Sequence, residues 1–140
     1  MGFQFIRRLT IEWGHCDPAG IVFNPRFFEF FDWSTAQLVQ AALGLETVDL
    51  ATAYGIVGIP LVDTRANFLR PSRYGEDVEI VSRVTAVGRS SFEIDHKLFS
   101  KAELAVEGHE RRVWTIRDAA TGRLKSRVLP EDVARRLSGA

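Results

Sequence analysis

The chain has 140 residues, of which 46% are hydrophobic and 26% charged, an ordinary composition for one globular domain. Eighteen lysines and arginines balance eighteen aspartates and glutamates, so there is no excess positive charge to attract a nucleic acid or an anionic membrane. Cys16 is the only cysteine, which excludes an intrachain disulfide and a cysteine-based zinc site.

We expect no targeting signal from the sequence either. Residues 1–8 lack the apolar core of a secretory signal. No apolar run approaches the roughly 20 residues that a membrane-spanning helix needs. We therefore expect one domain over residues 1–140, cytoplasmic, with no metal, no membrane contact and no nucleic-acid partner.

The first half of the chain predicts a strand followed by a long helix. Residues 3–12 alternate loosely between apolar and polar side chains, and a turn-rich stretch follows over residues 14–20. Asn24 and Pro25 suit an N-cap and a first helical turn, and Gly44 suits a C-terminal cap. The helix over residues 25–43 would be about 28 Å long. Most of its circumference is apolar, so we expect it to be buried.

The second half of the chain predicts mainly strands. A short helix is expected over residues 48–54, after which the hydrophobic period changes to two. Turn signals separate the strand candidates, and Gly88-Arg89 can close a tight hairpin. Residue 130 opens a short terminal helix. The expected strands cover residues 59–69, 77–87, 90–99, 104–118 and 123–128.

Consecutive strands with short connections pair antiparallel, and an apolar helix has to lie inside the curve of such a sheet. The expected fold class is therefore α+β. An antiparallel sheet of about five strands would wrap around one long central helix, which is the hot-dog arrangement.

Asp17 is the first candidate for catalysis because it lies on a Pro- and Gly-containing loop just before this helix. A helix N-terminus offers unpaired N–H groups to a developing oxyanion, and since Pro25 has none, the Asn24 amide is the expected donor. A carboxylate facing that donor can attack a thioester or deprotonate a water that does. The leaving thiolate, with a pKa of about 8.5, needs little acid assistance. The alternative is an aspartate that only stabilises its own turn.

At these residues the sequence resembles the 4-hydroxybenzoyl-CoA thioesterase family. The resemblance rests on residues 17–22, Asp-Pro-Ala-Gly-Ile-Val, followed by Pro25 and Asp32-Trp33, and it continues through residues 55–60, 89–92 and 128–130. It implies hydrolysis of an acyl-CoA, with Asp17 as nucleophile or general base. The helix N-terminal amide would bind the thioester oxygen. It also implies no cofactor, since coenzyme A belongs to the substrate, and a homodimer or homotetramer with sites at the dimer interface.

The resemblance also implies where the substrate binds. Residues that would contact the CoA phosphates are Arg89, Ser90, Ser91 and Lys125, although Gly88 stands where relatives carry a further base. The residues themselves suggest a role for Asp32, which lies between Phe31 and Trp33 in a helix that we expect to be buried. It would accept a hydrogen bond from a polar tip of the acyl group, such as the hydroxyl of a 4-hydroxybenzoyl ring. Phe23 and Phe27 would suit the ring, or are simply core residues.

Several alternatives remain open. Asp32 could instead form a structural ion pair with a base such as Arg65, because a buried carboxylate is costly unless it is paired. Cys16 with His15 could make a Cys-His thioesterase, and His15 with Glu29 or Asp32 a dehydratase. The acyl group could be a short chain. The same fold could also serve as an acyl-binding module without catalysis.

Overall fold

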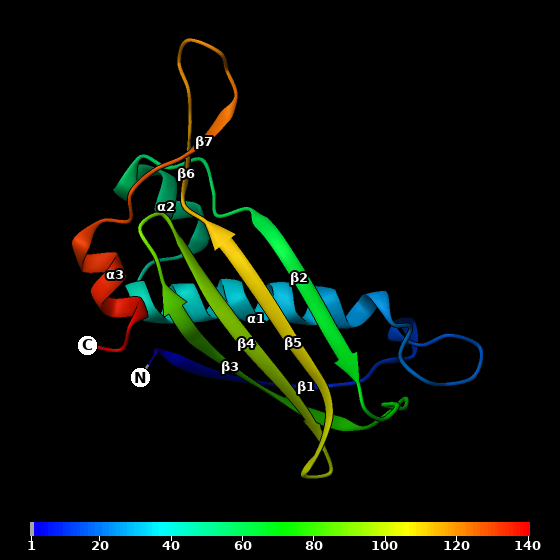
Figure 1. Ribbon diagram of the computed structural model, residues 1–140. Coiled ribbons are helices and arrows are strands. Elements are labelled where there is room, and N and C mark those ends of the chain that lie inside the picture. Colours follow the sequence, from blue (N-terminus) through cyan, green and yellow to red (C-terminus); the bar gives the residue numbers. More distant parts are fainter. Residues whose placement is uncertain (1) are drawn as a thin grey trace.

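The computed structural model describes residues 2–140, and its main element is one antiparallel sheet in the order β1-β3-β4-β5-β2 (Figure 1). Each named pair is antiparallel, as the sequence predicts for the hot-dog arrangement. The strands are β1 (Gln4–Thr10), β2 (Leu61–Phe68), β3 (Asp77–Val87), β4 (Ser91–Ser100) and β5 (Glu103–Val113).

The expectation that consecutive strands pair is correct for β3, β4 and β5, and for the two short strands after β5, but not for β1 and β2. The chain crosses from β2 at one edge of the sheet to β3 near the other edge, so β2 pairs with β5 and β1 pairs with β3. The crossing occurs in the connection over residues 69–76, which contains Pro71 and Gly75. Sequence periodicity gives the strands but not their partners, because partners are chosen by contacts far apart in the chain.

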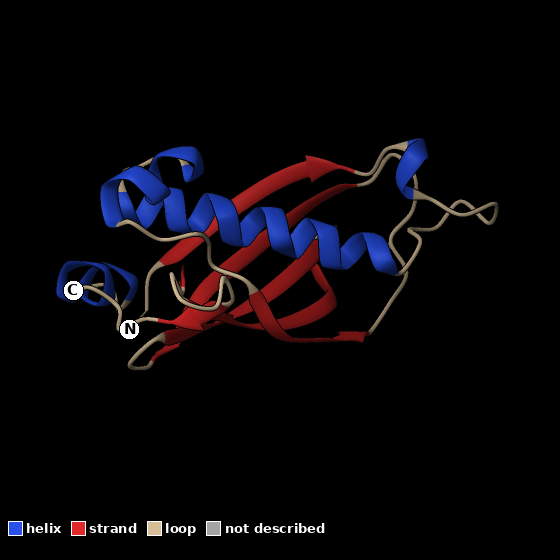
Figure 2. Cartoon of the chain, turned by 90° about the horizontal axis from the view of Figure 1, so that it is seen from above, coloured by secondary structure: helices blue, strands red, loops and turns tan. Residues whose placement is uncertain are grey.

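The long helix α1 (Pro25–Leu43) has the bounds expected from its terminal residues. Asn24 occupies the N-cap position and Pro25 the first turn, while Gly44 adopts a left-handed conformation with φ +69° that closes the C-terminus. The Asn24 side chain makes no capping hydrogen bond. Figure 2 shows α1 lying along the concave face of the curved sheet.

One side of α1 fills the core and the other side faces outward. Phe27, Phe31 and Leu38 are buried against the sheet, whereas Asp32 and Trp33 are exposed. The expectation that the helix is buried around most of its circumference is therefore wrong for a single chain. A sheet of five strands covers only one side of a helix.

Shorter elements complete the chain. A 3-10 turn, η1 (Trp13–His15), follows β1, and α2 (Thr47–Tyr54) follows α1. The expected last strand is not part of the main sheet: β6 (Thr115–Arg117) and β7 (Leu124–Ser126) form a separate ribbon that projects from the molecule (Figure 1). The terminal helix α3 (Glu131–Leu137) packs near the C-terminal end of α1. Within residues 2–140, no helix is long and apolar enough to cross a membrane.

Candidate functional site

The loop that carries Asp17 is built as a narrow hairpin in front of α1. The Asp17 amide donates to the Ile21 carbonyl at 2.9 Å, and the Phe23 amide donates to the His15 carbonyl at 2.9 Å. Gly20, with φ +79°, supplies the left-handed residue that the tight turn needs. In Figure 1 the loop projects beyond the N-terminal end of α1.

A segment remote in sequence holds this hairpin in place. The Val22 amide donates to the Ser72 carbonyl at 2.9 Å, and the Tyr74 amide donates to the Gly20 carbonyl at 3.1 Å. Residues 72–74, in the connection between β2 and β3, therefore lie beside the loop like a third strand. Sequence reasoning missed this support, because nothing in residues 72–74 indicates a partner some 50 residues earlier.

Asp17 is half-buried as a residue, and its carboxylate is only partly engaged by its own turn. Its Oδ1 accepts a hydrogen bond from the Ala19 amide at 2.8 Å, and the Asp17 carbonyl accepts one from the Gly20 amide at 2.9 Å. The second oxygen, Oδ2, has no hydrogen-bond partner within residues 2–140. The turn thus fixes the orientation of the carboxylate and leaves one oxygen available.

The start of α1 leaves the Asn24 amide available. Pro25 has no N–H, and the Arg26 and Phe27 amides donate to the carbonyls of Phe23 and Asn24. The Asn24 amide has no acceptor among the described residues. Asn24 opens onto a cavity of about 240 Å³ lined by Ile21, Val22, Asn24, Phe27, Phe68, Leu69, Arg70, Pro71 and Ser72.

The two phenylalanines expected to surround the acyl group lie in different environments. Phe27 is buried and lines the cavity at the start of α1. Phe23 is 53% exposed and is not among the residues that line this cavity. In a single chain, only Phe27 can therefore contact a ligand in that cavity.

The alternatives based on Cys16 and His15 lack the hydrogen bonds that they would need, although His15 and Glu29 line one cavity of about 500 Å³. The Cys16 thiol donates to the Glu12 carbonyl, and burial together with the neighbouring Asp17 charge raises the pKa of this thiol. His15 accepts the Glu12 amide on Nδ1 and packs edge-on against Phe30. No hydrogen bond joins His15 to Cys16 or to Glu29 in the part of the chain described.

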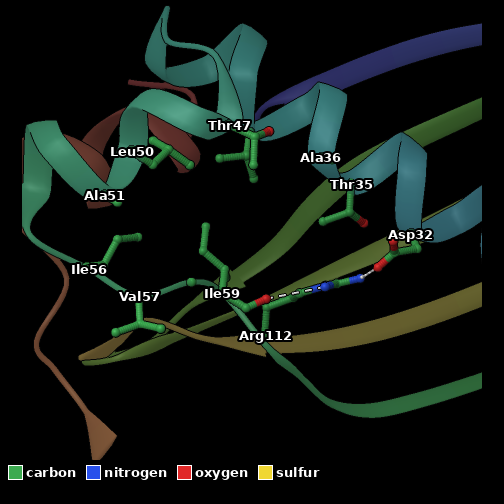
Figure 3. A pocket seen from close by; sticks show the side chains of 12 residues that line it. Asp32, Thr35, Ala36, Thr47, Leu50, Ala51, Ile56, Val57, Ile59 and Arg112 are labelled. Atoms are coloured by element: carbon green, nitrogen blue, oxygen red, sulfur yellow. Dashed lines mark hydrogen bonds and ion pairs between the residues drawn. The ribbon is translucent and has the colours of Figure 1, made fainter. Parts of the chain in front are cut away.

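Asp32 lies two turns further along α1 and is paired with Arg112 of β5. The Arg112 Nη2 donates to Asp32 Oδ1 at 2.6 Å, and the Asp32 side chain is 55% exposed. Arg65, the partner suggested by the sequence, pairs with Asp63 instead. Figure 3 shows Asp32 and Arg112 on one side of a cavity of about 270 Å³, with α2 across from them.

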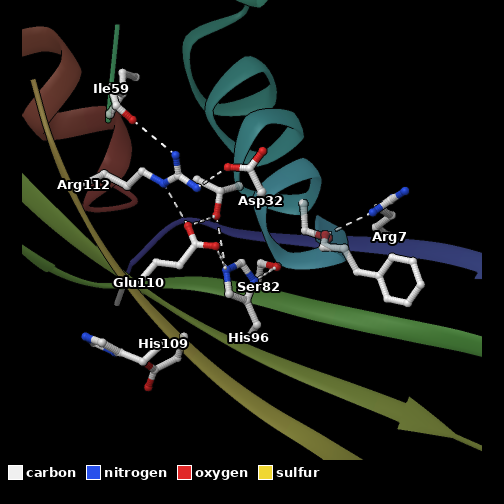
Figure 4. A network of polar contacts seen from close by, with 12 residues as sticks. Arg7, Asp32, Ile59, Ser82, His96, His109, Glu110 and Arg112 are labelled. Atoms are coloured by element: carbon white, nitrogen blue, oxygen red, sulfur yellow. Dashed lines mark hydrogen bonds and ion pairs between the residues drawn. The ribbon is translucent and has the colours of Figure 1, made fainter. Parts of the chain in front are cut away.

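Arg112 belongs to a buried polar network that reaches into the sheet (Figure 4). Its Nε donates to Glu110 Oε1 at 2.9 Å, and Thr35 Oγ1 donates to the same oxygen at 2.8 Å. His96 Nε2 lies 3.3 Å from Glu110 Oε2, and His96 Nδ1 lies 2.7 Å from Ser82 Oγ. Glu110, His96 and Ser82 are almost completely buried.

The network keeps its charged groups ionised despite their burial. Burial alone would raise the pKa of Glu110, but the hydrogen bond and charge of His96, together with Arg112, lower it below its ordinary value. Burial opposes the charge of Arg112, but Glu110 and Asp32 outweigh that effect and raise its pKa. Sequence reasoning missed this network. The available signal was the pair Glu110 and Arg112, two charged residues at alternate positions of one strand, whose side chains point to the same face of the sheet.

The expected phosphate-binding residues lie away from Asp17 in a single chain. Arg89 and Ser90 form the turn between β3 and β4, where the Leu129 and Trp114 amides donate to their carbonyls. Ser91 starts β4, and its carbonyl accepts the Gly88 amide at 2.7 Å. Lys125 is exposed on β7. These residues lie toward the C-terminal end of α1, whereas Asp17 lies beyond its N-terminal end (Figure 1).

Comparison with known proteins places this architecture in one family. A sequence model of the Thioesterase-like superfamily matches residues 11–137. The chain is 29% identical over 130 residues to 4-hydroxybenzoyl-CoA thioesterase of Pseudomonas sp. (strain CBS-3), covering 87% of this chain and 89% of that protein. It is 31% identical over 96 residues to 1,4-dihydroxy-2-naphthoyl-CoA hydrolase of Synechococcus elongatus, covering 69% of this chain and 68% of that protein.

The solved structures agree with the sequence matches. A crystal structure of a mutant 4-hydroxybenzoyl-CoA thioesterase complexed with 4-hydroxybenzoyl-CoA superposes with a TM-score of 0.89 at 25% identity, covering 97% of this chain and 99% of that one. A gentisyl-coenzyme A thioesterase superposes with a TM-score of 0.81, also at 25% identity, covering 92% and 98%. The fold, the nearly complete coverage and the family match agree, and the chain belongs to the Thioesterase-like superfamily, with the hot-dog fold.

Proposed function

We propose that this protein is an acyl-CoA thioesterase that hydrolyses an aromatic acyl-CoA to the free acid and coenzyme A. The relatives named above act on hydroxylated aromatic CoA thioesters. The observation that carries the proposal is the half-buried Asp17, held on a braced hairpin just before a helix start where the Asn24 amide is free. No cofactor is required, because coenzyme A is part of the substrate.

In the proposed reaction the thioester carbonyl oxygen accepts the Asn24 N–H, which stabilises negative charge as it develops on that oxygen. Asp17 either attacks the carbonyl carbon or takes a proton from a water that attacks it. The C–S bond then breaks and coenzyme A leaves as a thiolate. By the first route, water hydrolyses the mixed anhydride in a second step. Because a thiol has a pKa of about 8.5, coenzyme A can leave as a thiolate without help from a general acid.

We further propose that two chains complete each site. Asn24 and Asp32 are about 12 Å apart along the axis of α1, which is longer than a single aromatic ring. One acyl group held at Asn24 therefore does not reach Asp32 of the same chain. A homodimer or homotetramer would bring Asp32, and the basic residues Arg89 and Lys125, to the Asp17 loop of another chain.

The unpaired edge of β2 supports this assembly. β2 pairs with β5 on one side only, and exposed edges are usually covered or paired. Exposed apolar side chains lie along β2 and the segments that flank it, namely Val57, Leu61, Val62, Phe68 and Leu69. Pairing β2 with a second copy would cover both the edge and this apolar surface.

One observation favours a second candidate, an acyl-binding module without catalysis. The bond from the Ala19 amide to Asp17 is also what a purely structural turn aspartate makes. A panel of benzoyl, hydroxybenzoyl, acetyl and hexanoyl thioesters of CoA, followed with a thiol-reactive dye, separates the two. Turnover of the aromatic members supports the proposal. Binding of the thioesters without release of thiol supports the module, and turnover of only the short aliphatic members overturns the aromatic assignment.

A further inference from the structure

Ser72 is fully buried, and its hydroxyl has no hydrogen-bond partner among residues 2–140. Buried hydroxyls are nearly always hydrogen-bonded, because an unpaired one has given up its bonds to water and gained none in return. The other buried serines of the described chain follow this rule; Ser100, for example, donates to Glu76 Oε2 at 2.8 Å. A ligand that brings an acceptor to Ser72 would therefore form a hydrogen bond that the free protein lacks.

The Ser72 side chain projects toward the cavity at the start of α1. The antiparallel bridge between Ile21 and Arg73 puts Ser72 opposite Val22, whose amide donates to the Ser72 carbonyl at 2.9 Å. Directly opposed residues of two antiparallel segments project their side chains to the same side. Val22 and Ser72 are both buried, and both line the cavity of about 240 Å³ that Asn24 also lines. The unpaired hydroxyl and the available Asn24 amide therefore belong to one cavity.

The start of α1 supplies few donors to an oxyanion. Sites that stabilise a developing oxyanion commonly aim two hydrogen-bond donors at it. Pro25 has no N–H, and the amides of Arg26 and Phe27 already donate to carbonyls of the chain. Because the helix start leaves only the Asn24 amide available among these, a second donor has to come from another segment. Ser72 lines the same cavity and has a hydroxyl to supply it.

Burial makes the Ser72 hydroxyl suitable as this donor. Inside a protein a hydrogen bond to a charged oxygen is stronger than in water, because the dielectric is lower and no water competes. The bond would therefore strengthen as negative charge grows on the thioester oxygen. The charged donor in the same wall, Arg70, has 46% of its side chain exposed and is paired with Glu103, so it is less suited to this role.

We infer that Ser72 is a further catalytic residue, whose hydroxyl donates to the thioester oxygen together with the Asn24 amide. The hydroxyl keeps its proton and forms no covalent bond, and Asp17 or the water that it activates still attacks the carbonyl carbon. Because this hydrogen bond is strongest in the transition state, its loss should lower kcat more than it raises KM. The inference rests on the proposed thioesterase function and adds a second donor to that site.

The first test compares two serine-to-alanine variants on the aromatic acyl-CoA that the wild type hydrolyses best. Ser72→Ala should lower kcat by about 10- to 100-fold and change KM by less than about threefold. Ser100→Ala is the matched control, because it removes a buried hydroxyl that has a partner in the chain, and it should keep kcat within about twofold. A Ser72→Ala protein that keeps kcat within about fivefold overturns the inference alone. Absence of turnover by the wild type overturns the proposed function as well.

Unfolding experiments on the same variants separate this role from a structural one. Removing a hydroxyl that has no partner leaves no acceptor unpaired, so the urea midpoint of Ser72→Ala should equal or exceed that of the wild type. Ser100→Ala takes the donor from Glu76 Oε2 and should lower the midpoint. A Ser72→Ala midpoint as low as that of Ser100→Ala would make Ser72 a structural residue and overturn the inference.

Infrared spectra of a thioester that is isotope-labelled at the carbonyl carbon test the contact directly. Asp17→Asn should bind the substrate with little turnover, which allows the C=O stretch of the bound thioester to be recorded. Hydrogen bonds lower this frequency, so adding Ser72→Ala to Asp17→Asn should raise it, while adding Ser100→Ala should not. A hydroxyl that only orders the attacking water would leave the frequency unchanged. An unchanged frequency therefore overturns the inference, whatever the effect of Ser72→Ala on kcat.

Discussion

Replacing the buried Glu110 by Gln should destabilise the protein strongly. Glu110 accepts hydrogen bonds from Thr35 and Arg112 and lies 3.3 Å from His96, all inside the molecule. Removing one charge of a buried pair costs about 3–5 kcal/mol. In the Glu110→Gln variant Arg112 still has its ion pair with Asp32, and the glutamine oxygen can still accept one hydrogen bond. We therefore expect a loss of unfolding free energy at the lower end of this range, about 3 kcal/mol. For a chain of this size that corresponds to a fall in Tm of roughly 10 °C.

The assay is urea unfolding at a fixed protomer concentration, since assembly would make stability depend on concentration. Glu107→Gln is the control: Glu107 lies on the outer side of the same strand, and its substitution should stay within about 0.5 kcal/mol. A cost below about 1 kcal/mol for Glu110→Gln would refute the view that Glu110 is a charged anchor.

The pH dependence gives an independent check of the same reasoning. The folded-state pKa of Glu110 is lowered, so the unfolded chain binds its proton more readily. The stability that Glu110 contributes is therefore fully present above its unfolded pKa of about 4.3 and is lost as the pH falls through the folded value. The stability difference between wild type and Glu110→Gln should shrink below about pH 4.3. A difference that stays constant down to pH 3 contradicts this account.

Other predictions address packing, catalysis and assembly. Gly108→Ala should cost about 1–3 kcal/mol in unfolding experiments, because a Cβ there would lie 2.5 Å from the Phe31 ring, whereas Gly58→Ala, with open space, should be tolerated. Cys16→Ala should keep kcat within about twofold, because a thiol with a raised pKa is a weak nucleophile; a loss as large as that of Asp17→Asn would restore the cysteine mechanism. Light scattering at micromolar concentration should show at least a dimer, and an active monomer would contradict a site shared between chains.

Local signals in the sequence were enough to predict the main elements. Asn24-Pro25 and Gly44 mark both ends of α1, and the change of period to two locates β3 over the residues where the structure has it. The fold class followed from the order of the elements. The strand order did not, because the crossing from β2 to β3 depends on long-range pairing.

The candidate site was predictable only in part for the same reason. Asp17 and the free Asn24 amide are close in sequence, so their relation to the helix start could be inferred. The partner of Asp32 could not be, because Arg112 is 80 residues away and reaches α1 only through the pairing of β5 with its neighbours. Phe23 and Phe27 looked equivalent in sequence, yet only Phe27 faces inward once the helix is placed on the sheet.

The central claim is that Asp17 carries the chemistry, and the kcat of Asp17→Asn on an aromatic acyl-CoA tests it most directly. The substitution keeps the size of the side chain and can still accept from the Ala19 amide, so the fold should persist. Loss of an activated nucleophile or base should lower kcat by about 10³-fold or more, while Asp49→Asn, on exposed α2, should leave it unchanged. A folded Asp17→Asn protein that retains a tenth of the wild-type kcat would contradict the account.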